Sequence, residues 1–147
     1  MTAGGEGRAT IAVVDIDGVL ADPGHRTHHL QSRPKDWDGF FAAVSGDTLI
    51  ERGRSLVAEL ASEHEIVLLS GRPERTRVDT ADWLARHGIG YSRLVLRDDD
   101  DHRPAGLMKA DLIRAIGGPD VVGVVIDDEP GVVEALSRRG YTVRQFV

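Results

Sequence analysis

Short apolar runs alternate with amphipathic stretches along most of the chain. Short apolar runs, typical of strands buried on both faces of a parallel sheet, occupy residues 9–15, 65–70, 93–97 and 121–127, and residues 141–147 are interpreted as an edge strand. Apolar residues at helical spacing occupy residues 49–60, 74–88, 107–116 and 130–140. Strands and helices that alternate in this way predict an α/β fold with a mainly parallel sheet.

One stretch interrupts the alternation directly after the first predicted strand. Residues 21–47 are rich in proline, glycine and histidine, and they contain one aromatic segment, WDGFFAAV, at residues 37–44. We interpret residues 21–47 as an insertion that carries one short helix, because it is longer than an ordinary connection. We expect a flexible N-terminus at residues 1–9 and a single domain over residues 10–147, with the insertion as a lid or wall beside a substrate.

The composition limits the possible chemistry. The chain has 147 residues, 41% hydrophobic and 29% charged, which suits one ordinary globular domain. It contains no cysteine, so disulfides, thiolate chemistry and cysteine-ligated zinc are excluded. The net charge of −6 argues against broad binding to nucleic acid, although a local basic groove is compatible with it. Because no apolar run reaches the ~20 residues of a membrane span and no signal-peptide core is seen, we expect a cytoplasmic protein with no membrane partner.

Unusual polar residues follow the predicted strands. The set comprises Asp15 and Asp17 after the first strand, Ser70, Gly71 and Arg72 after the second, Asp127 and Asp128 after the fourth, and Lys109 in the helix between the third and fourth. In an open parallel sheet the carboxyl ends of the strands share one edge, and ligands bind there. The set therefore predicts one pocket built from four segments. It also predicts the strand order 5-4-1-2-3, because the acids after strands one and four must be adjacent.

The acidic residues of this set favour a hard cation. Asp15, Asp127 and Asp128 would repel one another if gathered together, so a cation is expected among them. Oxygen ligands together with a substrate phosphate are typical of Mg²⁺. Two other groups are weaker metal candidates. The acidic run at residues 98–101 is interpreted as a solvated loop, and the histidines within residues 25–29 match no zinc motif and are interpreted as insertion surface or substrate contacts.

The remaining residues of the set fit the binding and transfer of a phosphoryl group. The Ser70 hydroxyl and the amides around Gly71 can donate hydrogen bonds to phosphate oxygens, and Lys109 can neutralise an attacking carboxylate. In the pair Asp15 and Asp17, one carboxylate can attack phosphorus while the other transfers the proton of the leaving oxygen. The sequence thus predicts phosphoryl-transfer chemistry at the sheet edge.

Four segments carry a resemblance to a known superfamily. In chain order, DIDGVLAD, SGR, the lysine at position 109 and VIDDEP resemble the signature segments of the haloacid dehalogenase (HAD) superfamily in its phosphatase branch, from residue 11 to nearly the end of the chain. The resemblance implies a Rossmann-like three-layer sandwich with a small cap insertion after strand one. The roles it implies are Asp15 as nucleophile forming an aspartyl-phosphate, Asp17 as general acid and base, Ser70 as phosphoryl contact, Lys109 as charge anchor, and Mg²⁺ held by Asp15, the backbone carbonyl of Asp17 and Asp127, with Asp128 in support.

A closer resemblance exists within that superfamily. The 3′-phosphatase domain of phage-type polynucleotide kinase has an arginine in its insertion, an SGR motif, a D-x-R element before the lysine and a DD motif. The corresponding residues here are Arg26, Ser70 to Arg72, Asp101 to Arg103 with Lys109, and Asp127 with Asp128. The resemblance implies substrate contacts for Arg26, Gly71, Arg72 and Arg103. Ala105 stands where the phage type has an acid, a departure that weighs against specificity for nucleic acid. No GxxxxGK segment is present, so we expect no kinase domain in this chain.

These observations favour an enzyme over a binding module. We expect a magnesium-dependent phosphomonoesterase, with a nucleotide or polynucleotide 3′-phosphate end as one candidate substrate and a small sugar phosphate or 5′-nucleotide as the other. A phosphoaspartate receiver would carry its acceptor aspartate after the third strand, whereas the strand at residues 93–97 ends without an isolated one. The guanidinium groups of Arg26 and Arg72 are expected to face the substrate. For Arg26 the alternative is a surface residue, since 18 residues are basic and all but two of them are arginines.

Overall fold

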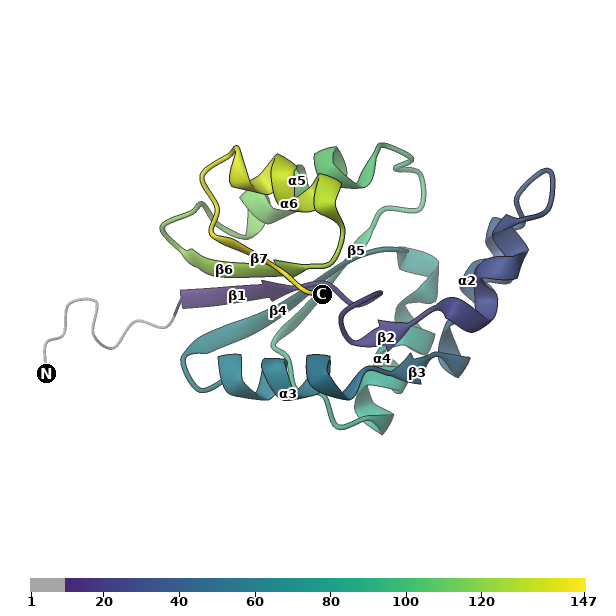
Figure 1. The fold of residues 1–147 in the computed structure, drawn as a ribbon, viewed down its shortest axis with the longest axis horizontal. Coiled ribbons are helices and arrows are strands. Elements are labelled where there is room, and N and C mark those ends of the chain that lie inside the picture. Colours follow the sequence, from purple (N-terminus) through teal and green to yellow (C-terminus); the bar gives the residue numbers. More distant parts are fainter. Residues whose placement is uncertain (1–9) are drawn as a thin grey trace, which may run out of the picture.

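A parallel sheet of five strands forms the centre of the molecule (Figure 1). The computed structural model describes residues 10–147, and the flexible segment predicted for residues 1–9 lies outside the described residues. The strands are β1 (Thr10–Val14), β4 (His64–Pro73), β5 (Arg93–Arg97), β6 (Val122–Asp127) and β7 (Val143–Gln145). Their order is β5-β4-β1-β6-β7, which is the order that the sequence predicts.

Helices cover both faces of this sheet. They are α3 (Glu51–Leu60), α4 (Arg77–Arg86), α5 (Ala105–Ile116) and α6 (Pro130–Ser137), and the 3-10 turn η3 (Glu74–Thr76) connects β4 to α4. Figure 1 shows α5 and α6 on one side of the sheet and α3 and α4 on the other. The predicted three-layer α/β sandwich is therefore confirmed. Within residues 10–147 no helix combines the length and the hydropathy that crossing a membrane requires.

The alternation of side chains along the strands supplies a core on each face of the sheet. In β1, Val14 packs in the same cluster as Leu84 of α4, whereas its neighbour Val13 packs in the cluster that contains Ile113 of α5 and Leu136 of α6. Successive side chains of a strand point to opposite faces, so a strand covered on both sides must be apolar at every position. This requirement explains the continuous apolar runs in the sequence.

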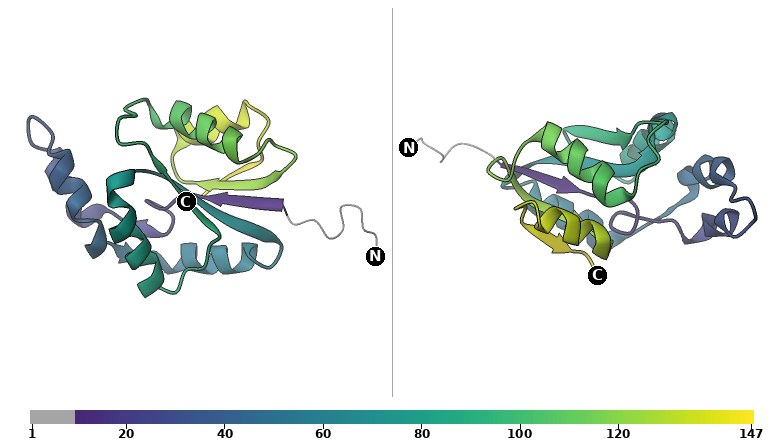
Figure 2. Two further views of the ribbon diagram at one scale, coloured as in Figure 1. Left: turned by 180° about the vertical axis from the view of Figure 1, so that it is seen from behind. Right: turned by 90° about the horizontal axis from the view of Figure 1, so that it is seen from above.

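The predicted insertion forms a separate lobe at the carboxyl edge of the sheet. It contains the 3-10 helices η1 (Gly24–Leu30) and η2 (Val44–Gly46) and the short helix α2 (Trp37–Ala42), and its ends pair as the antiparallel strands β2 (Ala21–Asp22) and β3 (Thr48–Leu49). Helix α2 begins after Asp36, whose carboxylate accepts a hydrogen bond from the Gly39 backbone N–H at 2.9 Å. Figure 2 shows this lobe extending beyond the end of β1, so it borders the edge where the site residues gather.

Candidate active site

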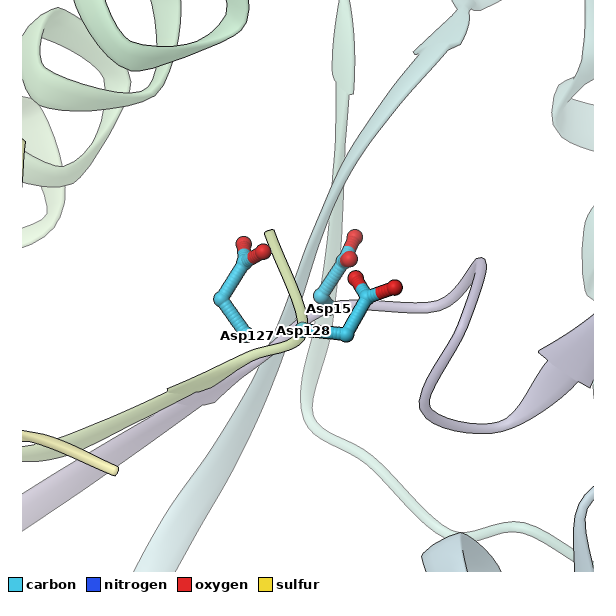
Figure 3. Close-up of side chains that lie close together, drawn as sticks. All are labelled: Asp15, Asp127 and Asp128. Carbon is cyan, nitrogen blue, oxygen red and sulfur yellow. The ribbon is translucent and has the colours of Figure 1, made fainter. Parts of the chain in front are cut away.

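Three carboxylates meet at the carboxyl edge of the sheet, as Figure 3 shows. Asp15 directly follows β1, and Asp127 is the last residue of the neighbouring strand β6 and is followed by Asp128. The backbone N–H of Asp15 donates to the carbonyl of Ile126 at 3.0 Å, which keeps the ends of the two strands in register. One oxygen from each carboxylate lies within 4.8 Å of the others. Adjacent parallel strands thus bring Asp15 together with two acids that lie more than a hundred residues later in the sequence.

Lys109 lies between two of these acids. Its Nζ is 2.7 Å from Oδ2 of Asp127 and 3.0 Å from Oδ1 of Asp15, and the side chain is almost fully buried. Burial alone would lower the pKa of Lys109, but the carboxylates of Asp15 and Asp127 outweigh this effect and raise the pKa above its usual value. The ammonium group therefore stays charged. It is on the fifth residue of α5, since that helix begins at Ala105.

The cluster contains more carboxylates than cationic groups, so it can bind an additional cation. Burial raises the pKa of Asp15 well above its usual value, the charge of Lys109 opposes this effect, and the nearby Asp127 and Asp17 add to it. Burial also raises the pKa of Asp128, again with a contribution from Asp127. One ammonium group does not balance three carboxylates. An all-oxygen donor set of this kind fits a hard divalent cation such as Mg²⁺.

Ser70 and Gly71 lie near the end of β4, which neighbours β1. Ser70 is fully buried, and its Oγ accepts a hydrogen bond from the Arg72 backbone N–H at 3.0 Å. The hydroxyl hydrogen of Ser70 is consequently free to be donated to another group. A Cβ atom added at Gly71 would meet its nearest neighbours at 3.6 Å or more, so the fold itself does not require a glycine there.

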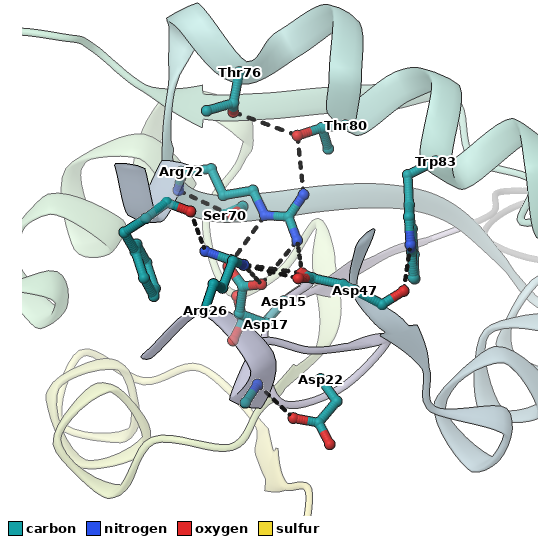
Figure 4. Close-up of polar contacts among 12 residues, drawn as sticks. Asp15, Asp17, Asp22, Arg26, Asp47, Ser70, Arg72, Thr76, Thr80 and Trp83 are labelled. Carbon is teal, nitrogen blue, oxygen red and sulfur yellow. Dashed lines mark hydrogen bonds and ion pairs between the residues drawn. The ribbon is translucent and has the colours of Figure 1, made fainter. Parts of the chain in front are cut away.

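Two buried arginines hold the carboxylate of Asp17 (Figure 4). Arg72 donates from Nε to Oδ2 of Asp17 at 3.2 Å and from Nη2 to Oδ1 at 2.8 Å. Arg26, from the insertion, donates from Nη2 to the same Oδ1 at 2.9 Å. Three of the four lone-pair positions of this carboxylate are occupied, which fixes its orientation. The position that remains is on Oδ2.

A fourth charged residue, Asp47, completes this network, and the motifs in the sequence gave no reason to select it. Its side chain is fully buried and accepts hydrogen bonds from Arg26 at 2.8 and 2.9 Å, from Arg72 at 2.9 Å and from His25 at 2.7 Å. Its backbone carbonyl accepts a hydrogen bond from the Trp83 indole at 2.9 Å. The need for this carboxylate becomes clear only from the structure, because Arg26 and Arg72 are both buried and need more negative charge than Asp17 alone supplies.

These contacts define the surroundings of the two arginines. Arg26 is fully buried, so the interpretation of it as a surface residue is wrong. Each guanidinium group has five N–H donors and makes four hydrogen bonds. Arg26 donates two to Asp47, one to Asp17 and one to the Phe40 carbonyl. Arg72 donates two to Asp17, one to Asp47 and one to the Thr80 hydroxyl. Direct contact of either arginine with a substrate stays a prediction. The observed contacts favour a role in positioning Asp17.

Arg103 is placed differently from the other predicted substrate contacts. Its guanidinium group is about half exposed and binds the carboxylates of Asp101 and Asp111. Hydrogen bonds from Arg103 hold the pKa of Asp101 below its usual range. Residues 98–101 form the loop after β5 and are largely exposed, consistent with a solvated loop. The predicted contact between Arg103 and a substrate stays a prediction.

Comparisons with known proteins identify the family of this fold and site. The sequence profile of the family described as the polynucleotide kinase PNKP phosphatase domain matches residues 9–147. Among curated proteins, none matches the chain. A chain in a structure of a Pnkp1/Rnl/Hen1 complex is 24% identical with a TM-score of 0.77, over 95% of this chain and 46% of that chain. A chain in the Pnkp1/Rnl/Hen1 RNA repair complex is 23% identical with a TM-score of 0.79, over 99% of this chain and 45% of that chain. This chain thus spans less than half the length of either.

A smaller solved protein has the same fold. A HAD family enzyme from Bacteroides thetaiotaomicron, solved in complex with magnesium and inorganic phosphate, is 13% identical with a TM-score of 0.59, and the match covers 93% of each chain. At this identity the likeness establishes the fold alone. The family profile, in contrast, covers nearly the whole chain. The chain belongs to the family of polynucleotide kinase PNKP phosphatase domains, and it is a hydrolase of the HAD phosphatase class.

Proposed function

We propose that this protein is a magnesium-dependent phosphomonoesterase that uses Asp15 as a covalent nucleophile and acts on nucleotide or polynucleotide 3′-phosphate ends. The observation that carries the proposal is the position of Lys109, whose ammonium group bridges Asp15 and Asp127 at 3.0 and 2.7 Å in a buried site. A fixed positive charge at this point lets a carboxylate approach a phosphate dianion, which would otherwise repel it. The Ser70 hydroxyl supplies a donor for the transferring phosphoryl group.

The proposed reaction has two displacements at phosphorus. In the first, a carboxylate oxygen of Asp15 forms a bond to phosphorus, the ester P–O bond breaks, and Asp17 gives a proton to the leaving alkoxide. In the second, Asp17 takes a proton from water, the water oxygen attacks phosphorus, and the bond between phosphorus and Asp15 breaks to release inorganic phosphate. The unoccupied position on Oδ2 of Asp17 is where this proton would be exchanged.

Mg²⁺ would be held by Asp15, Asp127 and the backbone carbonyl of Asp17, with Asp128 in support. When bound, it would neutralise charge on the phosphoryl oxygens and on the crowded carboxylates. The raised pKa values of Asp15 and Asp128 support a site that is arranged for a cation. The buried arginines would act through Asp17, because the orientation they impose on it decides whether its free lone pair reaches the leaving oxygen.

A substrate screen tests the proposed function. The protein is incubated with an aryl phosphate, nucleoside 3′- and 5′-monophosphates, 3′-phosphorylated oligonucleotides and sugar phosphates, each with and without Mg²⁺. We expect turnover that requires Mg²⁺, is lost in Asp15→Asn and is fastest on 3′-phosphates that carry a base. Higher kcat/KM on sugar phosphates than on every nucleotide would assign the protein to small metabolites instead. Wild-type turnover by Asp15→Asn would exclude the covalent route.

A further inference from the structure

A cavity of about 490 Å³ opens beside the candidate active site. Its lining includes Trp37 and Phe41 of α2 in the insertion, Gly71 near the end of β4, and Arg97 at the end of β5, and is completed by η3 and the loop after β5. None of these residues belongs to the acidic cluster or to the arginine network around Asp17. The cavity therefore needs an explanation of its own.

Two stacked aromatic rings form one wall. The rings of Trp37 and Phe41, one helical turn apart on α2, are nearly parallel, with their centroids 5.8 Å apart and an angle of 20° between planes. The guanidinium group of Arg75 lies over the Phe41 ring, 5.3 Å from its centroid. Packing against Phe41 fixes the indole, yet Trp37 remains 47% exposed. A large aromatic surface that is held in place and left accessible suits a flat ligand that can stack on it.

Arg97, at the end of β5, also lines the cavity. Nη1 of Arg97 donates to the backbone carbonyls of Asp101 and Arg103 at 3.0 and 2.9 Å, which holds the guanidinium group in place. Its Nε is buried and has no hydrogen-bond partner within residues 10–147. Buried donors are almost always paired, because an unpaired one loses its hydration without compensation. Asp99, another lining residue, accepts a hydrogen bond from the Arg75 backbone at 3.0 Å.

The cavity meets the predicted phosphate-binding segment at Gly71. Gly71 follows Ser70 directly in the chain, and Met108 precedes Lys109. A Cβ atom at Gly71 would lie 3.6 Å from Cε of Met108 and 3.7 Å from Nη2 of Arg97. The cavity thus reaches Gly71, the residue after Ser70, so the organic part of a phosphate ester held at Ser70 can extend towards it.

We propose that this cavity binds the nucleobase of the nucleotide that carries the 3′-phosphate, with Trp37 as the stacking surface and Arg97 as a polar contact. The inference rests on the proposed function and specifies its substrate as an end whose last base is unpaired, because a base can enter the cavity only when it is outside a duplex. Stacking on an aromatic side chain accepts any base, since each has a π-face. A sugar phosphate has no such plane and would leave the indole uncovered.

The first test compares two phosphate esters, one with a nucleobase and one without it. For wild type, Trp37→Ala and Trp37→Phe, kcat/KM is measured on a nucleoside 3′-monophosphate and on ribose 3-phosphate, which lacks the base. Loss of base stacking is expected to lower the nucleotide-to-ribose ratio about tenfold or more in Trp37→Ala and less in Trp37→Phe. Val121→Ala, which truncates another exposed apolar residue just before the amino end of β6, is the control and keeps the wild-type ratio. An unchanged ratio in Trp37→Ala overturns the base site.

The second test leaves Trp37 in place and measures binding. The chain has two tryptophans, and Trp83 is fully buried, so fluorescence quenching by a ligand reports on Trp37. In the inactive Asp15→Asn variant, the nucleoside 3′-monophosphate is expected to quench the Trp37 emission. Inorganic phosphate and ribose 3-phosphate are expected to leave the emission unchanged. Equal quenching by all three overturns the inference. If the aryl phosphate is hydrolysed with dependence on Asp15 while both tests fail, only the base site is lost; without such hydrolysis the proposed function itself fails.

Discussion

Arg72 binds the carboxylate of Asp17 through two hydrogen bonds. Its Nε donates to Oδ2 at 3.2 Å and its Nη2 donates to Oδ1 at 2.8 Å. This bidentate geometry uses the planar fork of a guanidinium group, and the Arg26 contact at 2.9 Å on Oδ1 reinforces it. Asp17 therefore has a single orientation with one free acceptor position. If Asp17 transfers the proton, the rate of that transfer depends on Arg26 and Arg72, which need not touch the substrate.

The first prediction concerns that pair. Arg72→Lys keeps a positive charge but cannot form both hydrogen bonds, so we expect kcat to fall by up to about 100-fold, with KM little changed. The loss should be the same for an aryl phosphate and a nucleoside 3′-phosphate, because the reacting group is affected and the rest of the ester is not. Steady-state kinetics on both substrates measure it. Arg77→Lys, which changes an exposed arginine paired with Glu74, is the control. A loss confined to the nucleotide would assign Arg72 to direct substrate binding.

The second prediction concerns Asp47. Replacing Asp47 by alanine removes one of the two carboxylates that the buried guanidinium groups share, the other being Asp17, and we expect the free energy of unfolding to fall by about 3 to 5 kcal/mol. Urea denaturation of the variant and wild type measures this change. Asp38→Ala is the matched control in the same insertion, because the Asp38 side chain is 96% exposed and its ion pair with Arg75 is 3.5 Å long. Equal stability of the two variants would show that the buried network is not a structural requirement.

The contrast between Asp47 and Asp15 shows what the sequence could reveal. The strand order and the convergence on one edge were predictable, because apolar runs mark the strands and parallel strands share their carboxyl edge. Asp15, Asp127 and Lys109 are next to or between such strands, so local pattern places them. Asp47 ends an irregular insertion, and its position beside Arg26 and Arg72 depends on how that lobe folds back over the sheet. The sequence did predict the insertion as a lid or wall beside a substrate, but the cavity at Trp37 depends on the same long-range packing and could not be located from the sequence.

The third prediction concerns Gly18, in the turn after Asp17. Its φ is +87°, and a Cβ atom there would lie 2.0 Å from Oδ2 of Asp128, so Gly18→Ala must both strain the backbone and displace that carboxylate. We expect a higher Mg²⁺ concentration for half-maximal activity and a lower thermal stability. The control is Gly90→Ala, because the space around Gly90 is open and its φ is ordinary. Unchanged Mg²⁺ dependence in Gly18→Ala would remove Asp128 from the metal site.

The fourth prediction concerns charge repulsion without metal. The pKa of Asp128 is raised by burial and by Asp127, so its ionised form destabilises the fold at neutral pH. We expect Asp128→Asn to melt at a higher temperature than wild type in EDTA at pH 7, and to gain less from added Mg²⁺. The advantage in EDTA should shrink as the pH falls towards about 4, where the carboxyl group becomes protonated in both states. Asp100→Asn, in the exposed loop, should behave as wild type in thermal melts.

The central claim is that Asp15 carries the phosphoryl group during turnover, and trapping that intermediate tests it most directly. The enzyme is mixed with a ³²P-labelled phosphate ester and Mg²⁺, quenched in acid, and the labelled peptide is mapped. The account predicts label on Asp15 that hydroxylamine removes, no label in Asp15→Asn, and turnover slowed by roughly 10² to 10⁴ in Asp17→Asn, the usual contribution of general acid–base catalysis. Substantial turnover by Asp15→Asn, or label mapped to another residue, would contradict it.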